Sequence, residues 1–408
     1  MKYFRYTLAN GLQILLQKVT SPVAHVGVFI RSGTVNEPPH LQGLAHFTEH
    51  ALFKGSQRRN SYEILSSIES VGGEMNAYTS KEETCYYASF LKEYLSDALD
   101  VFSDMLFNPV FPEEEIVKEK QVVLDEVESY QDNPAEQIFD DFETLLFGKH
   151  PLGRQILGKR KDVMAITRED LISYVSSNYQ PSRMLISCVG DFEPESLIRL
   201  AEKFFGHRLE YAPLQVALPR PRKKKPFHTT RKKANHQAHV VTGLLTEGPQ
   251  EKSYYPLNLL NLYIGGPLMM SRLNLSVREK YGLTYIIESN LNYYSTTGLF
   301  TIYFGTDTAQ VEKVLSIIRE EINRLRDKAL TAAELETLKR QYTGLAAIGW
   351  EVNQSRMLGA GKKTILGGYA ETFDEMKENI HRITAEELQE TAIRLLDPEH
   401  FSTLIFTP

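Results

Sequence analysis

Two histidines and a glutamate stand together in the run HFTEH at residues 46–50. Side chains at positions i and i+4 of a helix share a face, so His46 and His50 can direct two imidazoles to one ion, with Glu49 beside them. These are the components of a zinc site in which a carboxylate acts as base on metal-bound water, in the inverted order H-x-x-E-H. The alternative is an ordinary helix with two hydrogen-bonded histidines and a surface glutamate, and five residues alone do not decide between the two.

A catalytic zinc ion also needs a third protein ligand, with water in the fourth position. The acidic run KEKQVVLDEVESYQDNP, at residues 118–134, offers candidates. Glu119 and Glu126 are seven residues, or two helical turns, apart, so one can be a ligand while the other orients a histidine or the water. Spacing does not choose Glu126 over Asp125 or Glu128, and most acids of this helix must be solvated.

The elements that must position these groups follow from periodicity. Apolar residues at a period near 3.6 predict a helix over 43–53, while β-branched and aromatic runs ending at turn residues predict strands. Strands are expected at 25–33, 74–80 and 82–91, and further helices at 61–71, 93–107, after Pro112 and through 135–148. Because helices come in blocks and do not alternate strictly with strands, the pattern predicts an α+β fold.

The chain also contains an internal repeat. Similar segments begin at Ile166 and Ile383, an offset of 217, and both open with a Thr-x-x-acid capping box. FPEEEI at residue 111 and LTAAEL at residue 330 give an offset of 219. The two offsets predict one duplication, with halves at 1–210 and 236–408 joined by a Pro-rich, basic linker at 211–235. A nucleic-acid patch is the alternative interpretation of that charge run.

Composition limits the function classes. The 408 residues carry a formal net charge of −6, which gives no general attraction to nucleic acid or anionic membranes. Only two cysteines occur, which favours two reduced thiols over a disulfide framework. There is no secretory h-region and no apolar run of about 20 residues. We therefore expect a cytoplasmic protein that binds neither membrane nor nucleic acid.

Three segments together resemble a known family. GLAHFTEHALFKG, SIESVGGEMNAYTSKEETCYYA and EKQVVLDEVESYQDNP are similar to the inverted-zincin metallopeptidases of the pitrilysin, insulinase and mitochondrial processing peptidase family. The length is most similar to its bacterial, processing-peptidase-like branch. The resemblance implies a zinc endopeptidase with two homologous halves, each a mostly antiparallel sheet flanked by helices, forming half of a clamshell chamber.

The resemblance also implies roles for single residues. His46, His50 and Glu126 would bind one Zn²⁺ per chain, Glu49 would be the general base, and Glu119 a supporting acid. This choice of Glu126 comes from the family pattern and not from the spacing.

In the second half, the family pattern implies that Arg278 and Tyr285 bind substrate and stabilise the transition state. From the residues alone, a helix-surface arginine and a strand tyrosine are the simpler interpretation. The second half has no histidine between His239 and His381, so it cannot hold a second H-x-x-E-H motif.

The strand GGEMNAYTS suggests how substrate is bound. A strand that follows two glycines can leave one sheet edge open, and the resemblance implies that the matching strand pairs with substrate, so Asn76, Ala77 and Tyr78 are candidate contacts. An ordinary edge strand is the alternative for each of these residues. Main-chain pairing predicts peptide or unfolded polypeptide substrates. A family chamber uses four half-units and this chain has two, so the resemblance implies a homodimer. A non-catalytic scaffold or partner subunit is the competing hypothesis.

Overall fold

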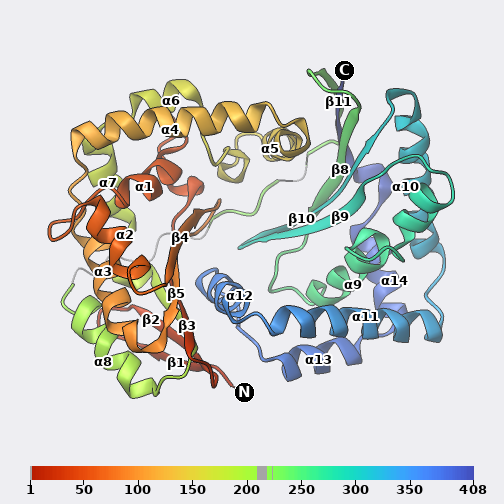
Figure 1. The fold of residues 1–408 in the computed structure, drawn as a ribbon. Coiled ribbons are helices and arrows are strands. Elements are labelled where there is room, and N and C mark those ends of the chain that lie inside the picture. Colours follow the sequence, from red (N-terminus) through yellow and green to blue (C-terminus); the bar gives the residue numbers. More distant parts are fainter. Residues whose placement is uncertain (1, 209–217, 223) are drawn as a thin grey trace. The chain divides into compact units, whose positions relative to one another are not determined.

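The computed structural model describes residues 2–208, 218–222 and 224–408 (Figure 1). They form two compact units, and neither is continuous in sequence. Unit 1 contains residues 2–129, 154–208 and 349–372, and unit 2 contains the other described residues. Within the described residues, no helix is both long and apolar enough to span a bilayer.

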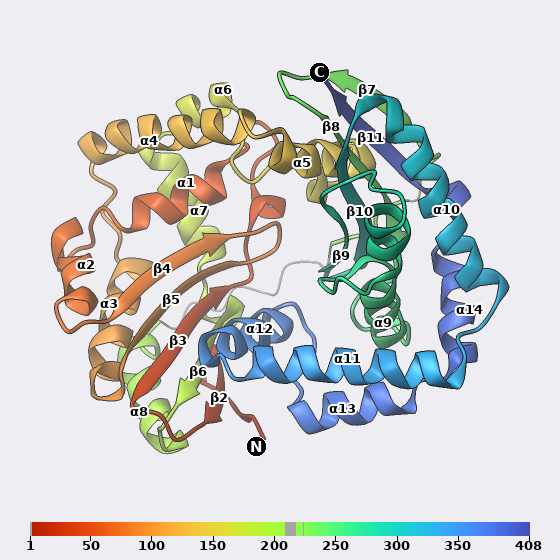
Figure 2. The same ribbon diagram turned by 45° about the vertical axis from the view of Figure 1, so that its right-hand side comes forward.

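Unit 1 is built on a six-stranded sheet with the order β1-β2-β6-β3-β5-β4. All neighbouring pairs are antiparallel except β2 and β6. The strands are β1 (Phe4–Thr7), β2 (Gln13–Lys18), β3 (Val23–Ile30), β4 (Glu74–Thr79), β5 (Thr84–Leu91) and β6 (Met184–Gly190). All seven residues of β6 are buried, as expected for a central strand covered on both faces. Figure 2 shows β4 at one edge of this sheet, next to β5.

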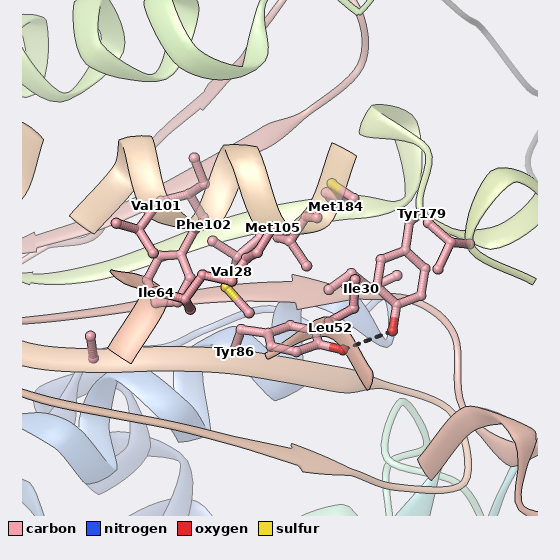
Figure 3. Packing of buried hydrophobic residues seen from close by; sticks show 14 of the residues in the cluster. Val28, Ile30, Leu52, Ile64, Tyr86, Val101, Phe102, Met105, Tyr179 and Met184 are labelled. Atoms are coloured by element: carbon pink, nitrogen blue, oxygen red, sulfur yellow. Dashed lines mark hydrogen bonds between the residues drawn. The ribbon is translucent and has the colours of Figure 1, made fainter. Parts of the chain in front are cut away.

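Alternating side chains of the sheet supply two apolar layers. Val26, Val28 and Ile30 of β3 belong to the larger cluster, together with residues of the N-terminal helices (Figure 3). Phe29 points to the opposite face, where it packs in a smaller cluster with Met357. The helices of unit 1 are α1 (Leu44–Leu52), α2 (Ser61–Glu69), α3 (Leu95–Phe107), most of α4 (Glu113–Gln131), α6 (Arg160–Ala165), α7 (Arg168–Asn178), α8 (Pro194–Phe205) and α12 (Asn353–Ile365).

Unit 2 has a five-stranded sheet with the order β7-β11-β8-β10-β9, in which only β7 and β11 are parallel. The strands are β7 (His228–Lys232), β8 (Ala238–Thr246), β9 (Ile287–Tyr294), β10 (Thr297–Thr306) and β11 (Ser402–Thr407). The helices are α5 (Pro134–Phe147), α9 (Tyr254–Gly265), α10 (Val311–Asp327), most of α11 (Ala332–Trp350), α13 (Phe373–Arg382) and α14 (Ala385–Leu395).

The two sheets repeat one topology. The order β2-β6-β3-β5-β4 in unit 1 corresponds to β7-β11-β8-β10-β9 in unit 2, with the single parallel pair at the same place. Helices α4 and α11 begin 219 residues apart, and α7 and α14 begin 217 residues apart. The predicted α+β class, with two homologous halves of mostly antiparallel sheet and flanking helices, is confirmed.

The compact units differ from the predicted halves in two segments. Helix α5 precedes the expected boundary yet packs on β8 and β11 of unit 2, and α12 packs on β3 and β6 of unit 1. Helical periodicity shows that a helix buries one face but not which sheet receives it. The division at 1–210, 211–235 and 236–408 therefore stays a prediction about homology, distinct from these units.

Part of the predicted linker is regular structure. Strand β7 lies inside it, and Arg231 of β7 pairs with Asp141 of α5 at 2.6 Å. Lys233 donates to the Gln137 side chain at 2.7 Å. These basic residues are therefore engaged by α5 within unit 2. Residues 209–217 and 223 of the linker lie outside the described residues.

Candidate metal centre

Helix α1 carries the H-x-x-E-H residues and is almost entirely buried. It begins after Gly43, whose φ of 95° suits glycine and whose own side chain cannot cap the helix. The cap comes from the loop before it: one oxygen of Glu37 accepts the Gly43 N–H at 3.1 Å and the Ala45 N–H at 2.9 Å. The buried carboxyl group of Glu37 thus fixes the first turn of α1 immediately before His46.

Helix α4 brings a carboxylate to the two imidazoles. Glu126 Oε2 lies 3.7 Å from His46 Nε2 and 3.7 Å from His50 Nε2. These three potential ligand atoms all lie within 4.8 Å of one another, and no other such group of three occurs in the described residues. Bonds of about 2.0–2.1 Å in a tetrahedral site separate ligand atoms by about 3.3 Å, so the donor set fits a zinc ion after small side-chain movements.

The neighbouring acids of α4 have other partners. Asp125 accepts a hydrogen bond from the Gln121 side chain at 2.6 Å. Glu128 pairs with Arg160 at 2.6 Å. Among the acids that spacing left open, the geometry therefore groups Glu126 with the histidines.

The two histidines have different surroundings. Burial lowers the pKa of His46 to about 3, so its ring is neutral at physiological pH, and its Nδ1 has no hydrogen-bond partner among the described residues. His50 Nδ1 lies 2.7 Å from Glu119 Oε1. Burial lowers the pKa of His50, but Glu119 and nearby carboxylates more than offset this and raise it above the usual value. A metal on His50 would bind at Nε2, while Glu119 accepts the Nδ1 proton.

Glu119 links His50 to a lysine. Its second oxygen lies 2.6 Å from Lys54 Nζ, and its side chain is only 6% exposed. Burial raises the pKa of Glu119, but the hydrogen bonds from His50 and Lys54 outweigh it and bring the pKa below its ordinary value. The carboxylate is therefore ionised, and it selects the tautomer that leaves His50 Nε2 free to bind a metal.

Glu49 lies on α1 but outside the group of ligand atoms. Its side chain is buried, and Thr79 Oγ1 of β4 donates to its Oε2 at 2.5 Å. Burial raises the pKa of Glu49, although the Thr79 bond and His50 act in the opposite direction. A buried carboxylate with a raised pKa is suited to accept a proton near neutral pH.

The candidate substrate-binding residues of the edge strand lie on β4. Asn76 is exposed, and its Oδ1 accepts the Ala77 N–H at 2.8 Å. The Tyr78 ring lies near Tyr87, with centroids 6.4 Å apart.

The structure brings Arg278 and Tyr285 together with each other in unit 2. The Arg278 guanidinium lies 4.9 Å from the centroid of the Tyr285 ring, and Tyr285 is 78% exposed. The three candidate ligands belong to unit 1.

Three side chains at the candidate centre, Glu37, Lys54 and Thr79, were not predicted. Lys54 follows His50 by four residues, so helical spacing could have suggested it. Glu37 comes from an irregular loop and Thr79 from the end of a strand, and no local pattern connects either with α1.

Comparison with known proteins gives matches over most of the chain. Residues 13–160 match the family described as insulinase (peptidase family M16), and residues 165–342 match the peptidase M16 inactive domain. The uncharacterized zinc protease YmxG of Bacillus subtilis is 36% identical over 405 residues, covering 98% of this chain and 97% of that protein. An uncharacterized zinc protease of Mycobacterium leprae is 31% identical, covering 98% and 91%.

Solved structures share the fold. A protease from Helicobacter pylori has a TM-score of 0.90 at 21% identity, covering 100% of this chain and 99% of that one. A protein from Pseudomonas fluorescens, described as a peptidase M16 inactive domain, has a TM-score of 0.93 at 20% identity, covering 100% and 98%.

Proposed function

We propose that this chain, which belongs to the insulinase family of peptidases (peptidase family M16), is a zinc-dependent endopeptidase that cleaves peptides or unfolded segments. The membership confirms the family resemblance predicted from the sequence. The observation that carries the proposal is the convergence of His46, His50 and Glu126, with three potential ligand atoms within 4.8 Å. A scaffold has no need for such a set beside a buried carboxylate.

In this mechanism the ligands are His46 Nε2, His50 Nε2 and Glu126 Oε2. A bound zinc ion would lower the pKa of a water molecule and polarise the scissile carbonyl. Glu49 accepts the proton of the attacking water and later delivers it to the leaving amine. Glu119 is a supporting acid that holds the His50 ring in the tautomer required for binding.

Substrate binding is assigned to main-chain pairing at β4. An extended peptide that adds to this edge would use backbone hydrogen bonds, so side-chain specificity would be broad and folded proteins would be excluded. Asn76, Ala77 and Tyr78 are the proposed contacts, Ala77 through its backbone and Asn76 and Tyr78, whose backbones pair with β5, through their side chains. Arg278 and Tyr285 are the proposed donors to the substrate carbonyl and the developing oxyanion.

We also propose that the active form is a cytoplasmic homodimer. The family chamber uses four half-units, and each chain provides two. Size-exclusion chromatography with mass measurement tests this, and an active monomer would exclude it.

The decisive experiment measures cleavage of an internally quenched, unstructured peptide by the purified chain before and after chelation. The matched variant is Glu49→Gln, which keeps the shape of the side chain and the ligand set. We expect about one zinc per chain in both proteins, and activity in the wild type alone. Cleavage that survives chelation or the substitution would refute the mechanism, and a zinc-loaded wild type without activity would favour the scaffold.

A further inference from the structure

The free edge of β4 is defined by the hydrogen-bond pattern of the strands beside it. The Lys92 N–H donates to the Pro22 carbonyl at 2.9 Å, and the Arg31 N–H donates to the Arg183 carbonyl at 2.8 Å. With the observed registers, even-numbered residues of β3 therefore bond to β5, and odd-numbered residues bond to β6.

The alternation continues across β5 to β4. Residues Asn76 and Tyr78 form the hydrogen-bonded pairs with β5. The backbone N–H and C=O groups of Met75, Ala77 and Thr79 consequently point away from β5, toward the unpaired edge. A peptide that extends this sheet at its β4 edge must pair with these three residues.

The side chain of Thr79 has a different task from its backbone. Strand alternation places it on the same face as Met75 and Ala77, which pack against the larger core cluster that contains α1 residues. There its hydroxyl donates to Glu49 Oε2 at 2.5 Å. This is the one hydrogen bond that the carboxylate of Glu49 receives from the described residues, and it leaves Oε1 free to exchange a proton.

We propose that Thr79 is a positioning residue that couples substrate pairing to the general base. Its backbone faces the edge where an extended peptide would add, and its hydroxyl fixes the orientation of the Glu49 carboxylate. One residue would thereby set both the register of the substrate and the direction of proton transfer. The inference rests on the proposed function.

The magnitude follows from the role of the base. General acid–base catalysis accelerates a reaction by about 10²–10⁴-fold, and a misoriented carboxylate retains part of this acceleration. Loss of the Thr79 hydroxyl should therefore lower kcat by about 10–100-fold. Because the backbone edge is unchanged, KM should stay within about threefold. Zinc content should be unchanged, since the Thr79 side chain is hydrogen-bonded to Glu49 and, within the described residues, to none of the candidate ligands.

The test compares Thr79→Val, which keeps the shape without the hydroxyl, with Thr79→Ser, which keeps the hydroxyl. Both are assayed as full chains with the quenched peptide, for kcat, KM and bound zinc. The control is Thr84→Val, which removes a hydroxyl from the residue paired with Thr79 on β5. Thr84 donates to the Ser32 carbonyl, so this control should lose stability while kcat is retained.

We expect Thr79→Val to lose kcat and Thr79→Ser to recover it to within about threefold of the wild type. The inference is overturned if Thr79→Val keeps kcat within twofold, if both variants are impaired equally, or if the valine variant loses its zinc. Such results leave wild-type activity intact, so the proposed function would survive them. A wild type that is inactive with zinc bound refutes the proposed function and this coupling together.

Discussion

Glu119→Gln removes one negative charge from the buried chain Lys54–Glu119–His50 and leaves its shape nearly unchanged. In the wild type, one Glu119 oxygen is 2.7 Å from His50 Nδ1 and the other is 2.6 Å from Lys54 Nζ. A glutamine oxygen still accepts the Nδ1 proton, but as a neutral acceptor. The substitution therefore removes the negative charge of Glu119 while the hydrogen bond to His50 is kept.

The expected cost follows from bond type. A hydrogen bond to a charged group contributes about 1.5–3 kcal/mol and a neutral one about 0.5–1.5 kcal/mol. The hydrogen bond that orients His50 is therefore weakened by roughly 1–1.5 kcal/mol, and the free energy of zinc binding falls by the same amount. That corresponds to a dissociation constant for zinc raised about tenfold. Lys54, with 27% of its side chain exposed, can turn toward water, which limits any further loss of fold stability.

The assay is competition for zinc between the metal-free chain and a fluorescent chelator. Glu115→Gln is the matched control, because it removes the same charge from the same helix, where Glu115 pairs with the exposed Lys118. Lys54→Met completes a double-mutant cycle: if Lys54 acts through Glu119, its effect should largely vanish in the glutamine background. A zinc affinity within twofold of the wild type, or the same loss in the control, would refute the reasoning.

Three further predictions concern the fold of unit 1. Burial raises the pKa of Glu37 to about 8, against 4.5 for a free glutamate, so the folded state favours its protonated form. The stability that this form contributes is fully present below pH 4.5 and is lost as the pH rises through about 8. In urea unfolding of the metal-free chain, wild type should lose stability relative to Glu37→Gln between pH 6 and 9, and parallel curves would contradict this. Gly361→Ala should lower the free energy of unfolding by about 1–3 kcal/mol, because its Cβ would lie 2.2 Å from the Phe29 ring. Gly359→Ala, where a Cβ meets open space, should instead raise it by up to about 1 kcal/mol. The opposite order in urea unfolding would exclude this packing of α12. Cys85 of β5 and Cys188 of β6 are buried, and burial raises the pKa of each thiol. Neither should therefore react with a thiol reagent before the chain unfolds. Labelling of the folded chain would exclude this arrangement of β5 and β6.

The sequence by itself determined the local parts of this protein. The spacing of His46, Glu49 and His50 places three polar groups along one side of a helix, whatever surrounds it. The strand and helix periods predicted an α+β fold, and the offsets of 217 and 219 residues predicted one duplication. The two mostly antiparallel sheets with flanking helices were implied by the family resemblance. These features depend on neighbours within about four residues or on self-similarity, and both are visible in a single chain.

Only the tertiary structure decided which distant groups meet. Helix spacing left Asp125, Glu126 and Glu128 open, and the packing of α4 against α1 puts Glu126 Oε2 at 3.7 Å from both histidines. The same holds for the Glu37 cap, for the Thr79 bond to Glu49, and for the sheets that receive α5 and α12. Periodicity fixes which face of an element is buried. The partner of that face depends on how whole elements pack, so contacts between residues far apart in the chain follow from the folded core.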